Sequence, residues 1–404
     1  MHKLVGMDAA PITPEEVPAY VDAAFSAFHN DVAEHHHARW KTVLEPERVL
    51  VVRDGEQIVA GGGIFSRRLT IPGGETPVAA VTLVGVRPTH RRRGLLSKIM
   101  RRQLADIHET GREAVAALWP SESVIYGRYG YGWAASTALL EVDKRRAALR
   151  SPSSAQVELL APADALDAMR AIHTVVLPQV PGMIDRDGPW WDDRVRDHES
   201  DRGGFQPLRA AVTEDAYALY AVKPVFAADR PAGTVEVREV VAATADARAA
   251  IWGYLLGLDL TVELTWELAP SDEPLPHMVT NAQDARLRIG DALWVRLVDV
   301  GRALAARTYR EPFEVVLEVA DDVCPWNAGR WALRWDGTTA TCAPTALPAS
   351  LELGAAELGA AYLGGTPLER LARAGRVHEL SAGALAAVSR GFGGARAPWC
   401  PEVF

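Results

Sequence analysis

The residues best suited to bind a charged ligand lie in one stretch, Val81–Met100, which reads VTLVGVRPTHRRRGLLSKIM. The pattern predicts a strand through Val84–Val86, a turn, three arginines at Arg91–Arg93, then Gly94 and an amphipathic helix. A helix amino terminus offers unpaired backbone N–H groups and the positive end of the helix dipole. Gly94 lets the backbone approach phosphate oxygens, and the arginines can add charge-assisted hydrogen bonds. The stretch therefore predicts a site for a ligand with several phosphate groups.

Taken alone, the spacing Arg-x-x-Gly is a weak signal, because it occurs by chance in many chains. A second example, Arg230–Gly233, precedes a predicted strand and cannot form such a site. A solvated basic start to the helix is the alternative interpretation of Arg91–Arg93. The order of strand, loop, helix and second strand around these residues favours ligand binding.

A second candidate group follows in Ser121–Ala134, which reads SESVIYGRYGYGWA. Tyr126, Tyr129 and Tyr131 could simply be packing residues. However, a phenol has a pKa of about 10, above the roughly 8.5 of a thiol, so it stays protonated at neutral pH. Tyr126 can therefore serve as a general acid that protonates a departing thiolate.

A set of helices and strands is predicted around these two stretches. Thr13, Pro14 and Glu16 have the types and spacing of a helix start, and the helix is expected to run to about Phe28. Asp54–Gly55 is a hairpin turn signal. The other expected elements are strands at residues 49–52, 58–65, 79–87, 114–119 and 136–142, a helix at 93–108 and a short helical turn after the fourth strand.

The remaining chain predicts two further domains, after a linker at Pro152–Ser154. A strand at 234–242, a helix at 244–256 and a strand at 261–268 repeat the order of residues 79–119. Their loop, Ala243–Asp246, lacks the arginines and glycine, so this domain is predicted to be a degenerate copy without the phosphate site. From about Asp291, strands at 293–298, 313–319, 331–335 and 338–342 precede helices at 355–362, 368–374 and 382–392, an α+β order. The expected fold is thus α/β (α+β), with domains at residues 1–150, 151–290 and 291–404.

Composition limits the classes of function. The 404 residues carry a net charge of −9, which disfavours a general nucleic-acid binder and suits cationic partners. Cys324, Cys342 and Cys400 form neither a disulfide framework nor a zinc pattern. The start of the sequence shows no signal peptide, and no apolar run is long enough to span a bilayer. We therefore expect a soluble, cytoplasmic protein.

Two further features lie in HHHARWKTV, which begins at His35. Three adjacent histidines cannot easily all face one ion, so a solvated run is predicted and no metal. Trp40 is a candidate wall of an acceptor cleft, because aromatic faces attract cations, although ordinary packing explains it equally well.

The two chemical stretches, in this order, resemble the GCN5-related N-acetyltransferase (GNAT) superfamily. The whole sequence resembles more closely the enhanced intracellular survival (Eis) family of actinobacterial acetyltransferases. The matching pieces are PTHRRRGLL at Pro88–Leu96, SE at Ser121–Glu122, IYGRYGYG at Ile125–Gly132, YALY at Tyr217–Tyr220, PLPH at Pro274–His277, LWVRLVDV at Leu293–Val300 and the final Phe404.

The resemblance implies an active acetyltransferase domain, a degenerate second one and a sterol-carrier-like domain whose end reaches the active site. It implies acetyl-coenzyme A (acetyl-CoA) as co-substrate, amines of aminoglycosides or polyamine-like cations as acceptors, and a homohexamer. Tyr126 corresponds to the acid and the terminal carboxylate of Phe404 to the base. Trp40 and Leu83 are the predicted substrate-binding residues. The implied acetyl-CoA contacts are Val84, Gly85, Val86, Arg91, Arg92, Arg93, Gly94, Leu95, Leu96, Ser97, Ser121 and Glu122.

Other functions remain open at the level of sequence. The acceptor could instead be a protein lysine. A non-catalytic scaffold that binds CoA, or a lipid carrier acting through residues 291–404, is a further alternative from another class.

Overall fold

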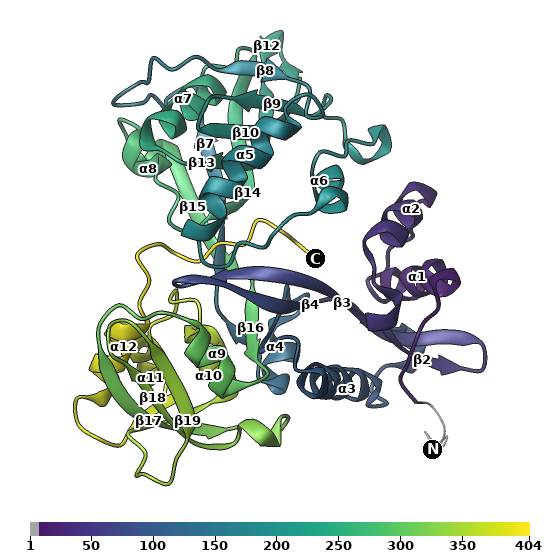
Figure 1. The fold of residues 1–404 in the computed structure, drawn as a ribbon. Helices are drawn as coiled ribbons and strands as arrows, with labels where there is room; N and C mark the ends of the chain where they lie inside the picture. The colour runs from purple at the N-terminus through teal and green to yellow at the C-terminus, as the bar shows by residue number, and fades with distance from the viewer. Residues whose placement is uncertain (1–7) are drawn as a thin grey trace. The chain divides into compact units, whose positions relative to one another are not determined.

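The computed structural model describes residues 8–404 and divides them into two compact units. Unit 1 contains residues 8–135, Ala292–Ala395 and Glu402–Phe404, and unit 2 contains Ser136–Asp291 and Arg396–Pro401. Figure 1 colours both by residue number. Residues 1–7, where the first domain was predicted to begin and no targeting signal was found, lie outside the described residues.

A seven-stranded sheet forms the centre of unit 1. Neighbouring strands are antiparallel except β4 and β5, which are parallel. In spatial order, the strands are β1 (Ala10–Pro11), β2 (Leu50–Asp54), β3 (Gln57–Ile71), β4 (Gly74–Val86), β5 (Val115–Leu118), β16 (Trp294–Leu297) and β6 (Gly132–Trp133).

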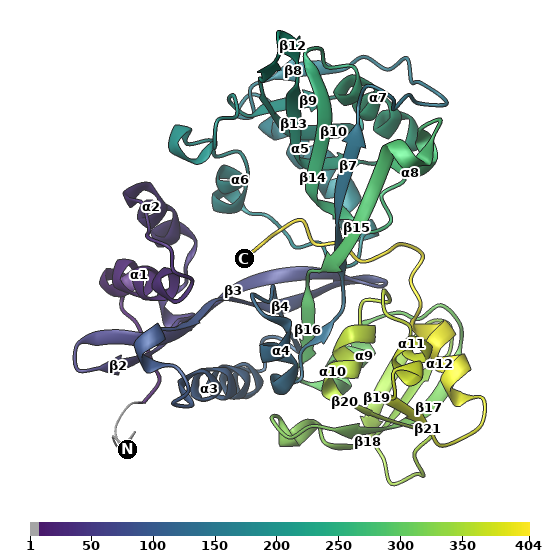
Figure 2. The same cartoon turned by 180° about the vertical axis from the view of Figure 1, so that it is seen from behind.

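Helices cover both faces of this sheet. Helix α1 (Val17–Ala27), followed by α2 (Glu34–Val43), lies on one side of β3 and β4, and α3 (Leu95–Thr110) lies on the other (Figures 1 and 2). The predicted helix start is present, because the Glu16 carboxylate accepts from the Thr13 backbone N–H at 2.9 Å. Helix α3 ends at Gly111, whose φ of 62° is the left-handed conformation that glycine adopts readily at helix ends.

A five-stranded sheet completes unit 1, and helices α9 (Val300–Ala306), α10 (Ala355–Ala361), α11 (Leu368–Arg373) and α12 (Ala384–Phe392) pack with it. Arg307 is fully buried within this part and donates to the carbonyls of Phe392 and Tyr362. The strands of this five-stranded sheet, in spatial order, are β19 (Ala340–Pro344), β18 (Gly329–Trp335), β17 (Phe313–Ala320), β20 (Leu351–Gly354) and β21 (Val377–Glu379).

Unit 2 has its own seven-stranded sheet and core. Its parallel pair, β13 and β14, is joined by helix α7 (Ala245–Leu256), as β4 and β5 are joined by α3. Helices α5 (Leu166–Val176), α6 (Gly188–Arg194) and α8 (Leu275–Met278) complete it. The strands, in spatial order, are β15 (Ala285–Asp291), β7 (Ser136–Asp143), β14 (Thr261–Pro270), β13 (Gly233–Ala242), β10 (Ala216–Lys223), β9 (Arg209–Val212) and β8 (Glu158–Leu160).

Two strands pair outside the domain to which the sequence analysis assigned them. The strand expected to close the first domain is β7, which pairs with β14 and β15 of unit 2. The strand expected to open the third domain is β16, which pairs antiparallel with β5. For β16 the reason is burial: every residue of β5 is buried, and a buried strand needs a hydrogen-bonded neighbour on each side. Strand β16 supplies the second neighbour.

Unit 2 contains a buried charged cluster. Arg186 and Arg194 donate to the Glu239 carboxylate at 2.5 and 3.0 Å, and Tyr217 donates to it at 2.9 Å. His173 lies beside this cluster, edge-on to Trp191 with ring centroids 5.2 Å apart. In the described residues, no helix is long and apolar enough to cross a membrane.

Burial, together with the charge of Arg186, lowers the pKa of His173 in this cluster to about 3. This pKa predicts how unit 2 responds to acid. The folded pKa of His173 is below that of an exposed histidine, about 6.5, so between these values the unfolded chain binds a proton that the folded chain does not. The free energy of unfolding should therefore fall as the pH drops below about 6.5, by up to about 1.4 kcal/mol per pH unit. Urea unfolding at pH 7, 6 and 5 should show a shallower loss in His173→Phe than in the wild type. Equal slopes would contradict the assignment.

Candidate active site

The site begins where β4 and β5 separate. Their register runs from Val78–Val115 to Val81–Leu118 and ends there, while β4 continues to Val86 beside β3. Beyond this point two cavities open, of about 630 and 280 Å³. Both are lined by Phe28, Val84, Ser121 and Tyr126, so they meet between the separated strands.

The larger cavity gathers nearly all the residues predicted to contact the acetyl donor. Arg93 is the exception, because it does not line the cavity and donates to the Thr89 carbonyl at 3.2 Å. The predicted residues that line it are Val84, Gly85, Val86, Arg91, Arg92, Gly94, Leu95, Leu96, Ser97, Ser121, Glu122 and Tyr126.

The loop before α3 and the first turn of the helix line the larger cavity. Gly94 is the N-cap with φ 78°, and no side chain caps the helix, so its first N–H groups have no side-chain acceptor. Arg91 fixes the loop by donating to the carbonyl of Ala27 at 2.6 Å. Arg92, with φ 61°, lines the cavity. An uncapped helix start and an arginine that line the same cavity suit phosphate oxygens.

Tyr126 lies at the end of α4 (Ser123–Tyr126), where the two cavities meet. Its side chain is buried, and burial raises its pKa above the usual value, with a smaller opposing effect from a hydrogen bond with Ser121. Tyr129 also lines the larger cavity, and its hydroxyl is 2.9 Å from that of Ser97. Tyr131 lies edge-on to Tyr126, at 6.4 Å between centroids, but lines neither cavity.

The smaller cavity contains the predicted acceptor residues Trp40 and Leu83 and the predicted base, Phe404. Trp40 is buried and stacks parallel to Phe65 at 6.5 Å, so it is both a wall of the cavity and a packing residue. The Arg39 guanidinium lies 4.7 Å from the centroid of the Trp40 ring. The geometry thus brings Tyr126 and the end of the chain into one space.

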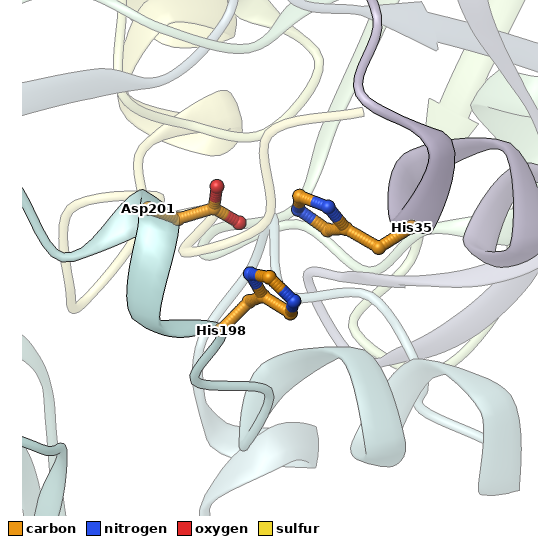
Figure 3. Close-up of side chains that lie close together, drawn as sticks. All are labelled: His35, His198 and Asp201. Carbon is orange, nitrogen blue, oxygen red and sulfur yellow. The ribbon is translucent and has the colours of Figure 1, made fainter.

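The adjacent histidines lie on α2 and are half-buried. His37 Nε2 is 2.8 Å from Asp22 Oδ1. Figure 3 shows His35 of unit 1 with His198 and Asp201 of unit 2. Within unit 2, Ser200 Oγ is 2.8 Å from His198 Nδ1 and donates to Asp201 at 3.0 Å. Because this group takes its members from separate units, we assign no metal site to it.

Several residues at the cavities had no signal in the sequence. Phe28 and His29 follow α1, and Trp119 follows β5, so they reach the site only through the fold. Thr82 and Leu118 are ordinary strand residues in the sequence. The position of Trp119, directly after a buried strand that ends at the site, was the one usable indication.

Comparisons with known proteins agree with this geometry. Models of the acetyltransferase (GNAT) domain match residues 8–134 and 182–297, and a model of the sterol carrier protein domain matches residues 300–401. The fold and site therefore define a GNAT-type N-acetyltransferase with two GNAT domains and a sterol-carrier-like domain. GNAT acetyltransferases use acetyl-CoA, and the cavity with its arginine loop and uncapped helix fits the phosphates of that molecule.

Relatives narrow the class further. An uncharacterized N-acetyltransferase of Streptomyces avermitilis is 42% identical, over 98% of this chain and 99% of that protein. N-acetyltransferase Eis of Mycobacterium tuberculosis is 34% identical, over 90% of this chain and 91% of that protein. The crystal structure of Eis1 from Mycobacterium abscessus matches with a TM-score of 0.87 and 34% identity, over 98% of this chain and 100% of that one. The chain belongs to the Eis family of N-acetyltransferases.

The loop geometry predicts that Arg92 contributes to binding of the donor. Arg92→Gln should weaken the affinity for CoA about tenfold, the effect of one charge-assisted hydrogen bond of roughly 1.5–3 kcal/mol partly replaced by water. Arg102→Gln removes the same charge from α3, where Arg102 pairs with Asp106, and should leave the affinity unchanged. Titration calorimetry with CoA measures both, and equal losses would mean that general charge, not the loop, determines the affinity.

Proposed function

We propose that the enzyme transfers the acetyl group of acetyl-CoA directly to an amine of an aminoglycoside or a polyamine-like cation. Tyr126 is the general acid, and the terminal carboxylate of Phe404 is the base or orients the amine. The observation that carries the proposal is the meeting of two cavities at Tyr126 and Val84, one lined by the arginine loop and the other by Trp40 and Phe404.

The position of Tyr126 and the protonation of its hydroxyl support its role as the general acid. In the reaction a neutral amine attacks the thioester carbonyl, a C–N bond forms, and the C–S bond breaks to leave the thiolate of CoA. Tyr126 supplies the proton that the thiolate takes up. Burial raises the pKa of Tyr126, so its hydroxyl stays protonated at neutral pH. Backbone N–H groups along Val84–Val86 are suited to polarise the carbonyl.

The proton of the amine needs a separate route. An α-carboxylate has a pKa near 3.5 and an alkylammonium near 10, so direct transfer between them is uphill by about 9 kcal/mol. The carboxylate of Phe404 can act as the base if burial raises its pKa or the cavity lowers that of the amine. Otherwise it orients the cation while water carries the proton outward.

The net charge of the protein and its resemblance to the Eis family support a cationic amine as the acceptor. The net charge of −9 attracts cations at long range, and the Phe404 carboxylate in the smaller cavity suits an ammonium group. From the family resemblance we also propose assembly as a homohexamer in the cytoplasm. No nucleic-acid partner is proposed.

The test is acetyl-CoA-dependent thiol release with untagged protein, against aminoglycosides, polyamines and lysine peptides. Aminoglycosides or polyamines should be acetylated. Tyr126→Phe should lower kcat about 10²- to 10⁴-fold, the usual contribution of a general acid. Deletion of Phe404 should also abolish most turnover.

The matched control is Tyr131→Phe, since this phenol lines neither cavity. It should keep wild-type turnover. Turnover only with lysine peptides would replace the small cation by a protein acceptor. Tight CoA binding without turnover on any amine would contradict the proposed mechanism and favour a CoA-binding scaffold.

The raised pKa of Tyr126 also predicts the pH profile. A general acid works in its protonated form, so activity is lost only above its pKa, here above the usual value of about 10. With a polyamine acceptor, kcat/KM should rise with pH as the amine deprotonates and should not fall again below about pH 10. A descending limb between pH 8 and 9 in the wild type, absent from Tyr126→Phe, would contradict this assignment.

A further inference from the structure

The backbone between the two cavities is irregular. Strands β3 and β4 pair Gly61 with Gly85 and Gly63 with Thr82, so Gly62 lies opposite two residues, Leu83 and Val84. This is a β-bulge, in which the extra residue leaves the regular hydrogen-bond ladder. Leu83 has φ +47°, a left-handed conformation that is unfavourable for a leucine. The bulge therefore needs other groups to hold it.

One such group comes from α1. Tyr20 is fully buried, and its hydroxyl donates to the Leu83 carbonyl at 2.9 Å. A hydrogen bond from the Gly63 backbone to the same hydroxyl partly offsets the rise that burial causes in the pKa of Tyr20. Tyr20 thus links β3 and β4 across the bulge. Glycine at position 61 makes room for the ring, because a Cβ there would lie 2.5 Å from Tyr20 Cε2.

The second group comes from α3, on the other face of the sheet (Figures 1 and 2). Gln103 is 1% exposed, and its Nε2 donates to the Gly62 carbonyl at 2.9 Å. The carbonyls of Gly62 and Leu83, on the two strands of the bulge, are therefore each bound by a buried side chain from a different helix. Neither Tyr20 nor Gln103 lines the two cavities, so neither is placed to touch a ligand there.

We propose that Tyr20 and Gln103 are positioning residues that hold this bulge, and with it the backbone N–H groups beside Val84, in the orientation that binds the thioester carbonyl. The inference rests on the proposed function. Leu83 and Val84 line the smaller cavity, and Val84 also lines the larger one. Oriented N–H groups stabilise the transition state without reorganisation during the reaction. Their loss should therefore lower kcat more than it weakens binding of acetyl-CoA.

The test compares Tyr20→Phe and Gln103→Met with the wild type. Tyr20→Phe keeps the ring and loses the hydrogen bond to Leu83. Each variant should lower kcat at least about tenfold, less than the roughly 10²–10³ for loss of a direct donor, while the KM for acetyl-CoA changes little. The double variant should lose less than the product of the two effects, because both residues hold one bulge.

The matched control is Tyr309→Phe. Tyr309 is a buried tyrosine of unit 1 whose hydroxyl donates to the Leu304 carbonyl at 2.8 Å, far along the chain from the bulge. It should lower Tm by about as much as Tyr20→Phe and leave kcat unchanged. A fall in Tm with unchanged kcat in Tyr20→Phe and Gln103→Met would reduce both residues to a structural role and overturn the proposal.

A second measurement needs no turnover. The infrared carbonyl band of acetyl-CoA labelled with ¹³C in the acetyl group should shift to lower frequency on binding to the wild type, and the shift should be smaller in Tyr20→Phe and Gln103→Met. If no amine is acetylated but the shift depends on these residues, the proposed function fails and the bulge assignment stands. A shift that is the same in all variants overturns the bulge assignment. Should Tyr20→Phe not fold, Gln103→Met gives the same decision.

Discussion

The separation of β4 from β5 is the constraint on which the rest of the site depends. Parallel pairing ends at Val81 and Leu118, and β3 alone continues beside β4 to Val86. A backbone edge is thereby left facing an opening at the carboxyl ends of two parallel strands. The larger cavity, the smaller cavity and Tyr126 are all arranged around that edge. Burial of β5 requires a neighbour on its other side, and β16, from a distant part of the chain, provides it.

Unit 2 has the same arrangement of strands and helix but a different helix start. Its strands β13 and β14 are also parallel, their pairing also ends early, at Val237 and Trp266, and α7 also connects them. The difference lies at the start of the helix. In α7 the Thr244 hydroxyl accepts from the Ala247 N–H at 3.2 Å, and Asp246 occupies the first turn. The amino terminus of α7 is thus capped and negatively charged, whereas that of α3 begins at Gly94 and follows three arginines. Unit 2 therefore has the same separation of two parallel strands but not the uncapped helix start that follows three arginines.

The site could be predicted from sequence where the signal is local. The turn before α3, its glycine cap and Tyr126 all lie within short stretches whose residue types determine their geometry. Local helix starts, such as Thr13 to Glu16, and hairpins, such as the one at Asp54–Gly55, were predicted for the same reason.

Pairing between strands that lie far apart in the chain was harder to predict from the sequence. An isolated strand carries an alternation of buried and exposed residues but not the identity of its neighbour, so β7 and β16 were assigned to domains other than those in which they pair. Tyr20 and Gln103 showed no signal, because an aromatic or polar residue on the buried face of a helix looks like packing until the carbonyl it binds is known. Three successive glycines at 61–63 were the one indication that another group comes close to β3.

The residues of the two cavities predict that acetyl-CoA binds unit 1 between the separated ends of β4 and β5. Amide hydrogen exchange with and without acetyl-CoA tests it most directly, because protection can be read along the whole chain. We expect slower exchange in residues 82–97 and 121–129 and no change around the start of α7, at residues 243–247. Protection confined to unit 2, or absent from the loop before α3, would contradict it.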